Sequence, residues 1–302
     1  MIVKSRGGAE QRWISKLPWT RCAAMEIRRA VARREFLLVY QPMVDLHTGR
    51  VTSCEALLRW NHPKHGVILP ADFLLLAERM RLMPRVGTWV LREALMQATT
   101  WPDEINVAVN LSATQFLAGD LPQVVRDALT ATGLVPGRLE LELTETIEPL
   151  AGSSLWDTLD QLQRLGVRLS IDDFGIGHSS VHRLRGFAFD KIKIDRSFVE
   201  GFPDRAEHLR FIRAVIALGA ELGITTTAEG AETRSEVEGL RLEGCSEVQS
   251  FFFSRALPSD EIREFLTLAQ PRGLTSALFD QRRLRNPLCH PRNTIRPADS
   301  MS

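Results

Sequence analysis

The stretch Ile171-Asp172-Asp173-Phe174-Gly175 places two adjacent carboxylates after a short apolar run, residues 167–171, and before a loop that contains glycine. Successive side chains of a strand point to opposite faces, so an Asp pair inside a regular strand cannot converge on one ligand. At a strand end, where the backbone turns into a loop, it can. Two carboxylates held together repel each other, and a pair of divalent metal ions is a common solution in phosphoryl chemistry. For this dipeptide alone, a solvated Asp-Asp turn is the alternative interpretation.

The composition limits the kind of protein. The chain has 302 residues, of which 44% are hydrophobic and 25% charged, and these suffice for one large domain or two small ones. A formal net charge of +1 gives no global attraction to nucleic-acid polymers or anionic lipid. Four cysteines (Cys22, Cys54, Cys245, Cys289) lack C-x-x-C spacing, which is typical of reduced intracellular thiols. Without a signal-peptide pattern or a membrane-length apolar run, the sequence predicts a soluble, cytoplasmic protein.

Three segments are expected along the chain. Residues 1–20 are predicted to be a flexible N-terminal lead-in, residues 21–270 a barrel domain, and residues 271–302 a disordered basic tail. The tail prediction rests on residues 281–302, which contain five arginines, three prolines and no long apolar run. A basic helical segment, Thr20–Glu35, is expected to dock on the domain rather than to lie on a membrane surface.

Strand-like runs alternate with helix-like runs between Phe36 and Ala269. The predicted strands are Phe36–Gln41, Val51–Arg59, Asn106–Asn110, Leu139–Thr144, Arg168–Asp172, Lys191–Asp195, Ile224–Glu229 and Glu247–Phe251. The predicted helices are Asp72–Arg79, Val86–Thr99, Leu121–Ala131, Leu155–Leu165, Ala206–Leu222 and Arg234–Leu242. Only the turn region Asp45–Gly49 separates the first two strands, which indicates a hairpin with one antiparallel strand, whereas strands followed by helices pair in parallel. The pattern predicts an α/β fold, a modified (β/α)8 TIM-like barrel; a doubly wound open sheet is the alternative.

Polar residues stand at the carboxyl ends of seven of the eight predicted strands. They are Glu55, Asn110, Glu142, Asp172, Asp173, Lys193, Asp195, Glu229 and Gln249. In a (β/α)8 barrel these ends meet at one mouth, where functional groups gather. In residues 139–143 and 191–195 charged residues alternate with leucine or isoleucine, so the charges face the barrel axis if the apolar residues face the helices. Metal ions or ion pairs with the lysine would offset this charge; a salt-bridged core without a metal is the alternative. An oxygen-rich donor set favours Mg²⁺ or Mn²⁺ over zinc.

The hexapeptide Glu55-Ala56-Leu57-Leu58-Arg59-Trp60 resembles the signature of the EAL-type cyclic di-GMP phosphodiesterases. Further motifs follow in the order of that family: Tyr40-Gln41-Pro42, Asn110-Leu111-Ser112, Glu142-Leu143-Thr144-Glu145, Asp172-Asp173-Phe174-Gly175, Lys193-Ile194-Asp195, Ala228-Glu229-Gly230-Ala231-Glu232 and Gln249. The resemblance covers residues 25–268. It implies a modified (β/α)8 barrel that hydrolyses cyclic di-GMP to linear pGpG with two divalent ions, Mg²⁺ or Mn²⁺, in bacterial second-messenger signalling. A homodimer is compatible with it.

The resemblance also implies a role for each matching residue. The expected metal ligands are Glu55, Asn110, Glu142, Asp172 and Asp173. The expected catalytic residues are Lys193, Glu229, Asp195 and Glu145. The expected substrate-binding residues are Arg59, Gln249 and Leu57. Lys193 would orient or deprotonate the attacking water, Asp195 would set the position and charge of that lysine, and Glu229 would approach the second metal. Arg59 would meet a phosphate with its planar fork, and Glu145 would anchor the loop after Asp173.

The sequence departs from the family's common pattern at four positions. Ile176 and His178 replace the usual threonine and tyrosine, Ser250 replaces a glycine beside the expected ligand rim, and Ala256 replaces a frequent proline. None of the four removes an expected metal ligand, so the departures bear on rate and affinity rather than on the class of reaction. The alternative function is a catalytically weak module that acts as a cyclic di-GMP receptor or a protein-interaction regulator. Loss of metal ligands would be expected of such a regulator.

Overall fold

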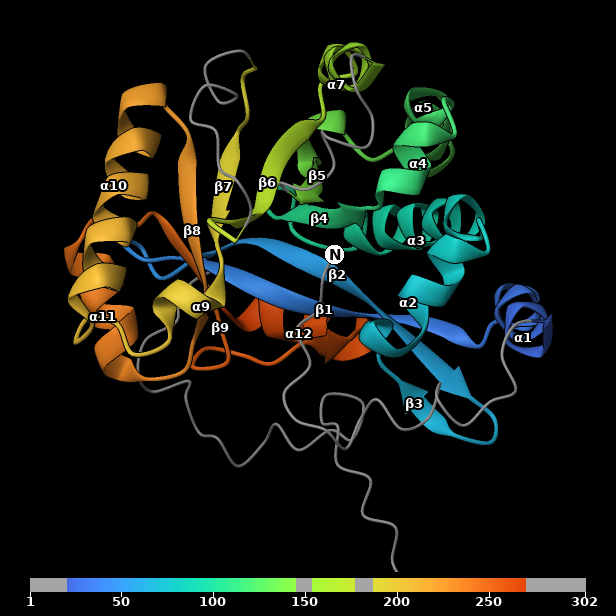
Figure 1. The fold of residues 1–302 in the computed structure, drawn as a ribbon, viewed down its shortest axis with the longest axis horizontal. Coiled ribbons are helices and arrows are strands. Elements are labelled where there is room, and N and C mark those ends of the chain that lie inside the picture. Colours follow the sequence, from blue (N-terminus) through green and yellow to red (C-terminus); the bar gives the residue numbers. More distant parts are fainter. Residues whose placement is uncertain (1–20, 145–153, 177–186, 270–302) are drawn as a thin grey trace, which may run out of the picture.

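The computed structural model describes residues 21–144, 154–176 and 187–269, so Glu145, His178, the expected lead-in and the expected tail lie outside the described residues. Eight strands form a closed barrel (Figure 1). They are β1 (Phe36–Asp45), β2 (Val51–His62), β4 (Asn106–Leu111), β5 (Leu139–Thr144), β6 (Arg168–Phe174), β7 (Lys191–Ile194), β8 (Thr225–Ala231) and β9 (Glu247–Ser250). Two short strands, β3 (Gly66–Ile68) and β10 (Leu257–Pro258), pair with β2 and β1.

Strand β1 closes the barrel, because it pairs with both β2 and β9 and is antiparallel to each. The other neighbouring pairs around the ring, from β2–β4 to β8–β9, are parallel. The predicted barrel with one antiparallel strand is therefore confirmed. The open-sheet alternative is wrong, since a doubly wound sheet has two unpaired edges and this ring has none.

Helices surround the barrel (Figure 1). They are α1 (Arg21–Ala32), α2 (Pro70–Arg79), α3 (Met83–Ala98), α4 (Ala113–Leu117), α5 (Leu121–Thr132), α7 (Ser154–Arg164), α9 (Arg196–Val199), α10 (Ala206–Leu222), α11 (Arg234–Leu242) and α12 (Ser259–Ala269), with a 3-10 turn η3 (Pro136–Arg138). The sequence pattern predicts all of the long ones except α12. Within the described ranges, none of these helices has both the length and the hydropathy needed to cross a bilayer.

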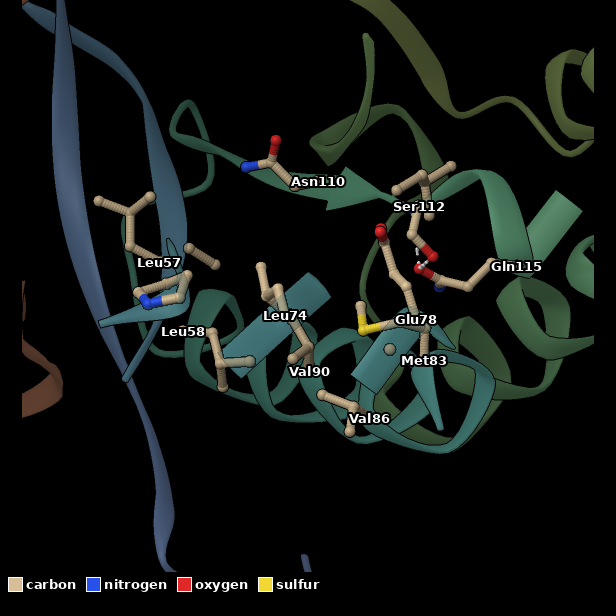
Figure 2. Close-up of a pocket in the computed structure, with 14 residues that line it drawn as sticks. Leu57, Leu58, Leu74, Glu78, Met83, Val86, Val90, Asn110, Ser112 and Gln115 are labelled. Carbon is tan, nitrogen blue, oxygen red and sulfur yellow. Dashed lines mark hydrogen bonds between the residues drawn. The ribbon is translucent and has the colours of Figure 1, made fainter. Parts of the chain in front are cut away.

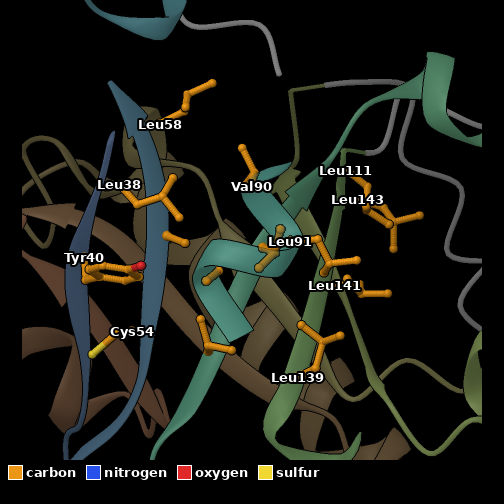
Figure 3. Packing of buried hydrophobic residues seen from close by; sticks show 14 of the residues in the cluster. Leu38, Tyr40, Cys54, Leu58, Val90, Leu91, Leu111, Leu139, Leu141 and Leu143 are labelled. Carbon is orange, nitrogen blue, oxygen red and sulfur yellow. The ribbon is translucent and has the colours of Figure 1, made fainter. Parts of the chain in front are cut away.

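The apolar core lies between the strands and the helices. Figure 3 shows part of it, including Val90 and Leu91 of α3 and Leu139, Leu141 and Leu143 of β5. All six residues of β5 are buried, so the glutamates between those leucines face the barrel interior. The predicted alternation of charge and leucine therefore holds, and it places ionisable groups where water has little access.

The strand that carries the Asp pair does not end at Asp172, as the sequence suggested. Strand β6 continues to Phe174, and its pairing with β7 shifts register between Ile171 and Phe174. Asp173 has a φ of 54°, in the left-handed region that a non-glycine residue seldom adopts. This is a β-bulge, which interrupts the alternation of side chains and re-aims them. A bulge, and not the end of the strand, therefore interrupts the alternation of side-chain directions at Asp172 and Asp173.

A second bulge lies in β8, and it bears on the site described below. Its pairing with β9 joins Glu229 to Gln249 and then Ala231 to Ser250, so Gly230 is the extra residue. Gly230 has a φ of 75°, and a Cβ at this position would lie 2.5 Å from Cβ of Arg196. Only glycine fits here without displacing the backbone, because both the conformation and the space exclude a side chain.

Candidate active site

Lys193 lies at the centre of the candidate site. Its Nζ atom is 2.6 Å from Oε1 of Glu229, 2.9 Å from Oε1 of Glu142, 3.3 Å from Oδ1 of Asp172 and 3.7 Å from Oε2 of Glu55. The four carboxylates come from β8, β5, β6 and β2, so the closure of the barrel brings together residues far apart in sequence. In strand β7 the side chains of Ile192 and Ile194 face outward, so the Lys193 side chain between them points toward the barrel axis.

Two carboxamides hold Glu55 from either side. Asn110 donates a hydrogen bond from Nδ2 to Oε1 of Glu55, and Gln249 donates one from Nε2 to Oε2 over 2.6 Å. The register of the parallel pair β2–β4 and the contact of β1 with both β2 and β9 place these three side chains at the same level. The amides fix the orientation of the Glu55 carboxylate, while the oxygens of both amides remain available as metal or ligand acceptors.

The electrostatics of the site follow from burial and crowding. Burial alone would lower the pKa of the Lys193 amine, but the surrounding carboxylates, Asp172 and Glu142 foremost, raise that pKa well above its usual value. Burial raises the pKa of Glu142 well above its ordinary range and that of Glu229 to about 8, and Lys193 opposes both shifts. One ammonium therefore does not neutralise the carboxylates around it.

Asp173 and Asp195 lie beside this cluster. Burial, together with the charges of Asp172 and Asp195, raises the pKa of Asp173 to about 6. Asp195 is the N-cap of α9, where its Oδ1 accepts a hydrogen bond from the backbone N–H of Ser197 over 2.9 Å. In the described part of the chain, the carboxylates within 4.0 Å of the Lys193 ammonium are the four named above. Asp195 is not among them, and its carboxylate caps α9 instead.

The donor set fits hard divalent cations in chemical type and charge. Oε2 of Glu142 and Oε1 of Gln249 are buried without a hydrogen-bond partner in the described part of the chain, which is costly unless a cation or water satisfies them. In the described residues, no three acidic, imidazole or thiol groups are already arranged around one point as ligands. In this arrangement the Lys193 ammonium is the cation that the carboxylates approach. Carboxylate and carboxamide oxygens are the ligands that Mg²⁺ and Mn²⁺ prefer.

A pocket opens beside this cluster, between β2, β4, α2, α3 and α4. It holds about 560 Å³ of empty space, including the part open to solvent. Figure 2 shows Leu57 and Leu58 on one side and Glu78, Ser112 and Gln115 on the other. A hydrogen bond from Ser112 Oγ to Gln115 Oε1, together with one from the Ser112 N–H, caps helix α4 and fixes the polar side of the pocket. Asn110, which donates a hydrogen bond to Glu55, also lines the pocket, so the pocket and the cluster share this residue.

The structure places the residues expected to bind substrate in two settings. Leu57 lines the pocket, and Arg59, two residues further along the same face of β2, is half-buried and donates from Nη1 to the carbonyl of Leu58. Gln249 is buried and contacts Glu55. Ser250, expected at the ligand rim, is 1% exposed and is the last residue of β9, where it pairs with Ala231 of β8. Ile176 is exposed and Ala256 is buried.

Sequence reasoning missed three features of the site. Glu78 on α2 lines the pocket, although nothing in its local sequence marks it as more than a surface glutamate. Glu247 reaches Lys191 in the barrel interior, and the alternation of residues 247–250 could have indicated that inward direction. The hydroxyl of Ser250 has two partners, which depend on the β8 bulge and are not visible in a linear pattern.

A closed barrel with an acid-rich cluster and a central lysine at one mouth defines a class of α/β-barrel domain suited to metal-assisted chemistry on phosphate esters. The comparison with known families is in agreement. Residues 24–256 match the sequence model of the family described as the EAL domain, so the chain belongs to the EAL domain family.

Curated relatives match over most of this chain but are much longer. An uncharacterized protein y4lL of Sinorhizobium fredii is 43% identical over 242 residues, which cover 80% of this chain and 29% of the relative. The bifunctional diguanylate cyclase/cyclic di-GMP phosphodiesterase MucR of Pseudomonas aeruginosa is 40% identical over 241 residues, which cover 78% of this chain and 35% of the relative. The chain thus spans about a third of the length of these relatives.

Solved structures give the same architecture. The PaMucR phosphodiesterase in complex with c-di-GMP superposes with a TM-score of 0.74 at 39% identity, covering 80% of this chain and 99% of that one. The EAL enzyme Bd1971, in a form with cAMP and cyclic-di-GMP bound, superposes with a TM-score of 0.76 at 30% identity, covering 80% of this chain and 68% of that one. The similarity extends to the whole barrel.

Proposed function

We propose that this domain hydrolyses cyclic di-GMP to linear pGpG in a reaction that depends on Mg²⁺ or Mn²⁺. The observation that carries the proposal is the charge of the cluster, in which four carboxylates approach one ammonium. An excess of buried negative charge is energetically unfavourable unless further cations balance it. Membership of the EAL domain family and the c-di-GMP complex of the 39% identical PaMucR structure support the choice of substrate.

The residues that would hold two divalent ions are Glu55, Asn110, Glu142, Asp172 and Asp173, with Glu229 beside the second ion. When bound, the ions would supply Lewis-acid activation of the attacking water and charge neutralisation at the phosphate. The raised pKa of Lys193 keeps its amine protonated near neutral pH. In that protonated, metal-free form the Lys193 amine is a hydrogen-bond donor suited to orienting the attacking water, one of the two roles that the resemblance implies.

The pocket suits a flat nucleobase of the ligand. Leu57 and Leu74 supply apolar walls, and Glu78 supplies a carboxylate that can accept from the N1–H and N2–H donors of guanine. Arg59 would contact a phosphate oxygen, and the free Oε1 of Gln249 would accept from water or ligand. A base seated in the pocket would place the adjoining phosphate toward Asn110 and the carboxylates, because the pocket and the cluster share that residue.

Hydrolysis measured by chromatography of the nucleotide products tests the proposal. Purified protein with Mn²⁺ or Mg²⁺ is expected to convert cyclic di-GMP to pGpG, and Glu55→Ala is expected to abolish turnover while the fold remains. Binding of cyclic di-GMP without hydrolysis by the wild type would instead identify a receptor module. Neither binding nor hydrolysis would contradict the proposed substrate.

The proposal extends to the context of the domain. We place it in the cytoplasm, supported by the buried free thiols of Cys54 and Cys245, and we assign residues 21–270 to the domain. A homodimer is the assembly that we propose, and light scattering of the purified protein distinguishes it from a monomer. Activities of the longer relatives outside this domain are not assigned to this chain.

A further inference from the structure

Ser250 is the last residue of β9, and its side chain is buried between two strands. Only 1% of the residue is exposed to solvent. Its Oγ donates a hydrogen bond to the carbonyl oxygen of Ala231 in β8 and accepts one from the backbone N–H of Phe252 over 2.9 Å. The one donor role of the hydroxyl and one of its two acceptor roles are thus filled by backbone groups, which fix its orientation between the two strands.

One partner of the Ser250 hydroxyl, the carbonyl of Ala231, belongs to the residue that directly follows the bulge of β8. Glu229 pairs with Gln249, Gly230 is the extra residue, and Ala231 pairs with Ser250. The hydroxyl holds Ala231, the first residue after the bulge, whereas the strand pairing of Glu229 with Gln249 holds the residue before it. On the β9 side, the contact with Phe252 fixes the turn that begins at Ser250, where the N–H groups of Phe253 and Ser254 also bond to the Ser250 carbonyl.

Glu229, just before the bulge in β8, and Gln249, just before Ser250 in β9, both reach the candidate active site. Oε1 of Glu229 lies 2.6 Å from Nζ of Lys193, and Nε2 of Gln249 lies 2.6 Å from Oε2 of Glu55. A shift of the bulge would move Glu229 relative to the lysine, because a bulge re-aims the side chain beside it.

We infer that Ser250 is a positioning residue, whose hydroxyl sets the β8 bulge and thereby the placement of Glu229 and Gln249 for catalysis. The inference rests on the proposed hydrolysis, although one of its tests does not. Removal of the hydroxyl takes one hydrogen-bond partner from the carbonyl of the buried Ala231 and from the N–H of the half-buried Phe252. The backbone then relaxes around the flexible Gly230, and Glu229 leaves its contact with Lys193 in part of the population.

The chain offers a matched control in the same turn. Ser254 is also 1% exposed, and its Oγ donates to the carbonyl of Arg255 over 2.8 Å and, in the described part of the chain, to no residue of β8. Ser250→Ala and Ser254→Ala each remove one buried hydroxyl. The first is expected to lower kcat about three- to ten-fold, the range that one hydrogen bond accounts for, with KM for cyclic di-GMP nearly unchanged. Ser254→Ala is expected to keep kcat, and Ser250→Thr, which retains the hydroxyl, is expected to recover most of it.

Hydrogen exchange of the metal-free proteins, measured by mass spectrometry, gives a readout that needs no activity. Ser250→Ala is expected to exchange faster than the wild type in peptides that cover residues 229–232 and 251–253, whereas Ser254→Ala leaves residues 229–232 unchanged. Equal kcat for Ser250→Ala and wild type, or an equal fall in kcat for both alanine variants, would overturn the inference. If the wild type does not hydrolyse cyclic di-GMP, the proposed function fails, and unchanged exchange at residues 229–232 in Ser250→Ala separately refutes the role of the hydroxyl in the bulge.

Discussion

The barrel interior contains two ionic layers that differ in how their charges balance. The lower layer consists of Lys191, Glu140 and Glu247, with Lys191 Nζ 2.8 Å from Glu140 Oε2 and 3.0 Å from Glu247 Oε2. The upper layer consists of Lys193 with Glu55, Glu142, Asp172 and Glu229. Each layer is built around one buried lysine on the same strand, two residues apart, so the backbone provides nearly the same setting for both.

The number of carboxylates separates the two layers. In the lower layer two carboxylates share one ammonium, and Thr227 Oγ1 donates to Glu247 Oε2 over 2.9 Å. Burial would raise the pKa of Glu247, but Lys191 and the hydroxyl hold it below its usual value. In the upper layer four carboxylates share one ammonium, and the pKa values of Glu142 and Glu229 are raised. Similar residue types thus make a lower layer with one carboxylate in excess over its ammonium and an upper layer with three in excess, and the larger excess is suited to binding cations.

Replacement of the lysine in each layer is expected to have the largest and most contrasting effects. Lys193→Ala removes the proposed water-orienting donor and should lower kcat by about 10³-fold, within the range of a positioned proton-handling group. Binding of cyclic di-GMP should survive. Steady-state kinetics with calorimetric ligand binding measures both, and a matched loss of binding and kcat would indicate a structural lysine instead.

Lys191→Met should act on stability rather than on catalysis. Removal of one partner from a buried ion pair leaves uncompensated charge on Glu140 and Glu247 and typically costs about 3–5 kcal/mol. Urea denaturation should show this loss in the free energy of unfolding, with kcat of the folded fraction close to wild type. The triple variant Lys191→Met, Glu140→Gln, Glu247→Gln should regain much of the stability, and a failure to do so would contradict unpaired charge in the lower layer as the cause of the loss.

The pH dependence of stability should have opposite signs in the two layers. Because the pKa of Glu229 is raised to about 8, this carboxyl stays protonated in the folded metal-free protein at pH values where it is ionised in the unfolded chain, so its contribution to stability should fall as the pH rises toward 8. One such group contributes at most about 1.4 kcal/mol per pH unit. Glu247, with its lowered pKa, adds stability above its unfolded pKa that is lost as the pH falls through its folded pKa.

Urea denaturation with chelator at pH 5.5 to 8.5 tests this difference. Glu229→Gln should flatten the slope between pH 6 and 8, and Glu247→Gln should change only the acidic side. Identical pH profiles of the free energy of unfolding for wild type and Glu229→Gln would contradict a raised pKa of Glu229 in the upper layer.

The smallest expected effect concerns the loop after the Asp pair. Ile176 is 43% exposed, and its N–H donates to the carbonyl of Asp173 over 3.3 Å. Combined Ile176→Thr and His178→Tyr substitutions restore the family's common pattern and are predicted to lower the Mg²⁺ concentration for half-maximal rate about five-fold, the size of one hydrogen bond of about 1 kcal/mol. Superimposable Mg²⁺ titrations would show that these positions do not tune the metal site.

Much of the fold was predictable because its signals are local. The alternation in residues 139–143 and 191–195 indicated inward charges, and the turn at Asp45–Gly49 indicated the hairpin. The bulge at Asp173 was not predictable, because it depends on register with β7 and on Gly175, where a Cβ would lie 2.4 Å from Cζ of Phe211. The expected role of Asp195, to set the position and charge of Lys193, stays a prediction, as do the roles of the other candidate residues.

Cation binding by the two layers is the most direct test of the account. Isothermal titration calorimetry with Mn²⁺ should show binding to wild type and to Glu140→Gln, a lower-layer variant. Glu142→Gln removes one charge from the upper layer and should weaken binding at least about tenfold, since even the outer partners of metal ligands contribute that much. Mn²⁺ affinity unchanged in Glu142→Gln, or weakened equally in Glu140→Gln, would contradict the claim that the excess carboxylates of the upper layer are the cation site.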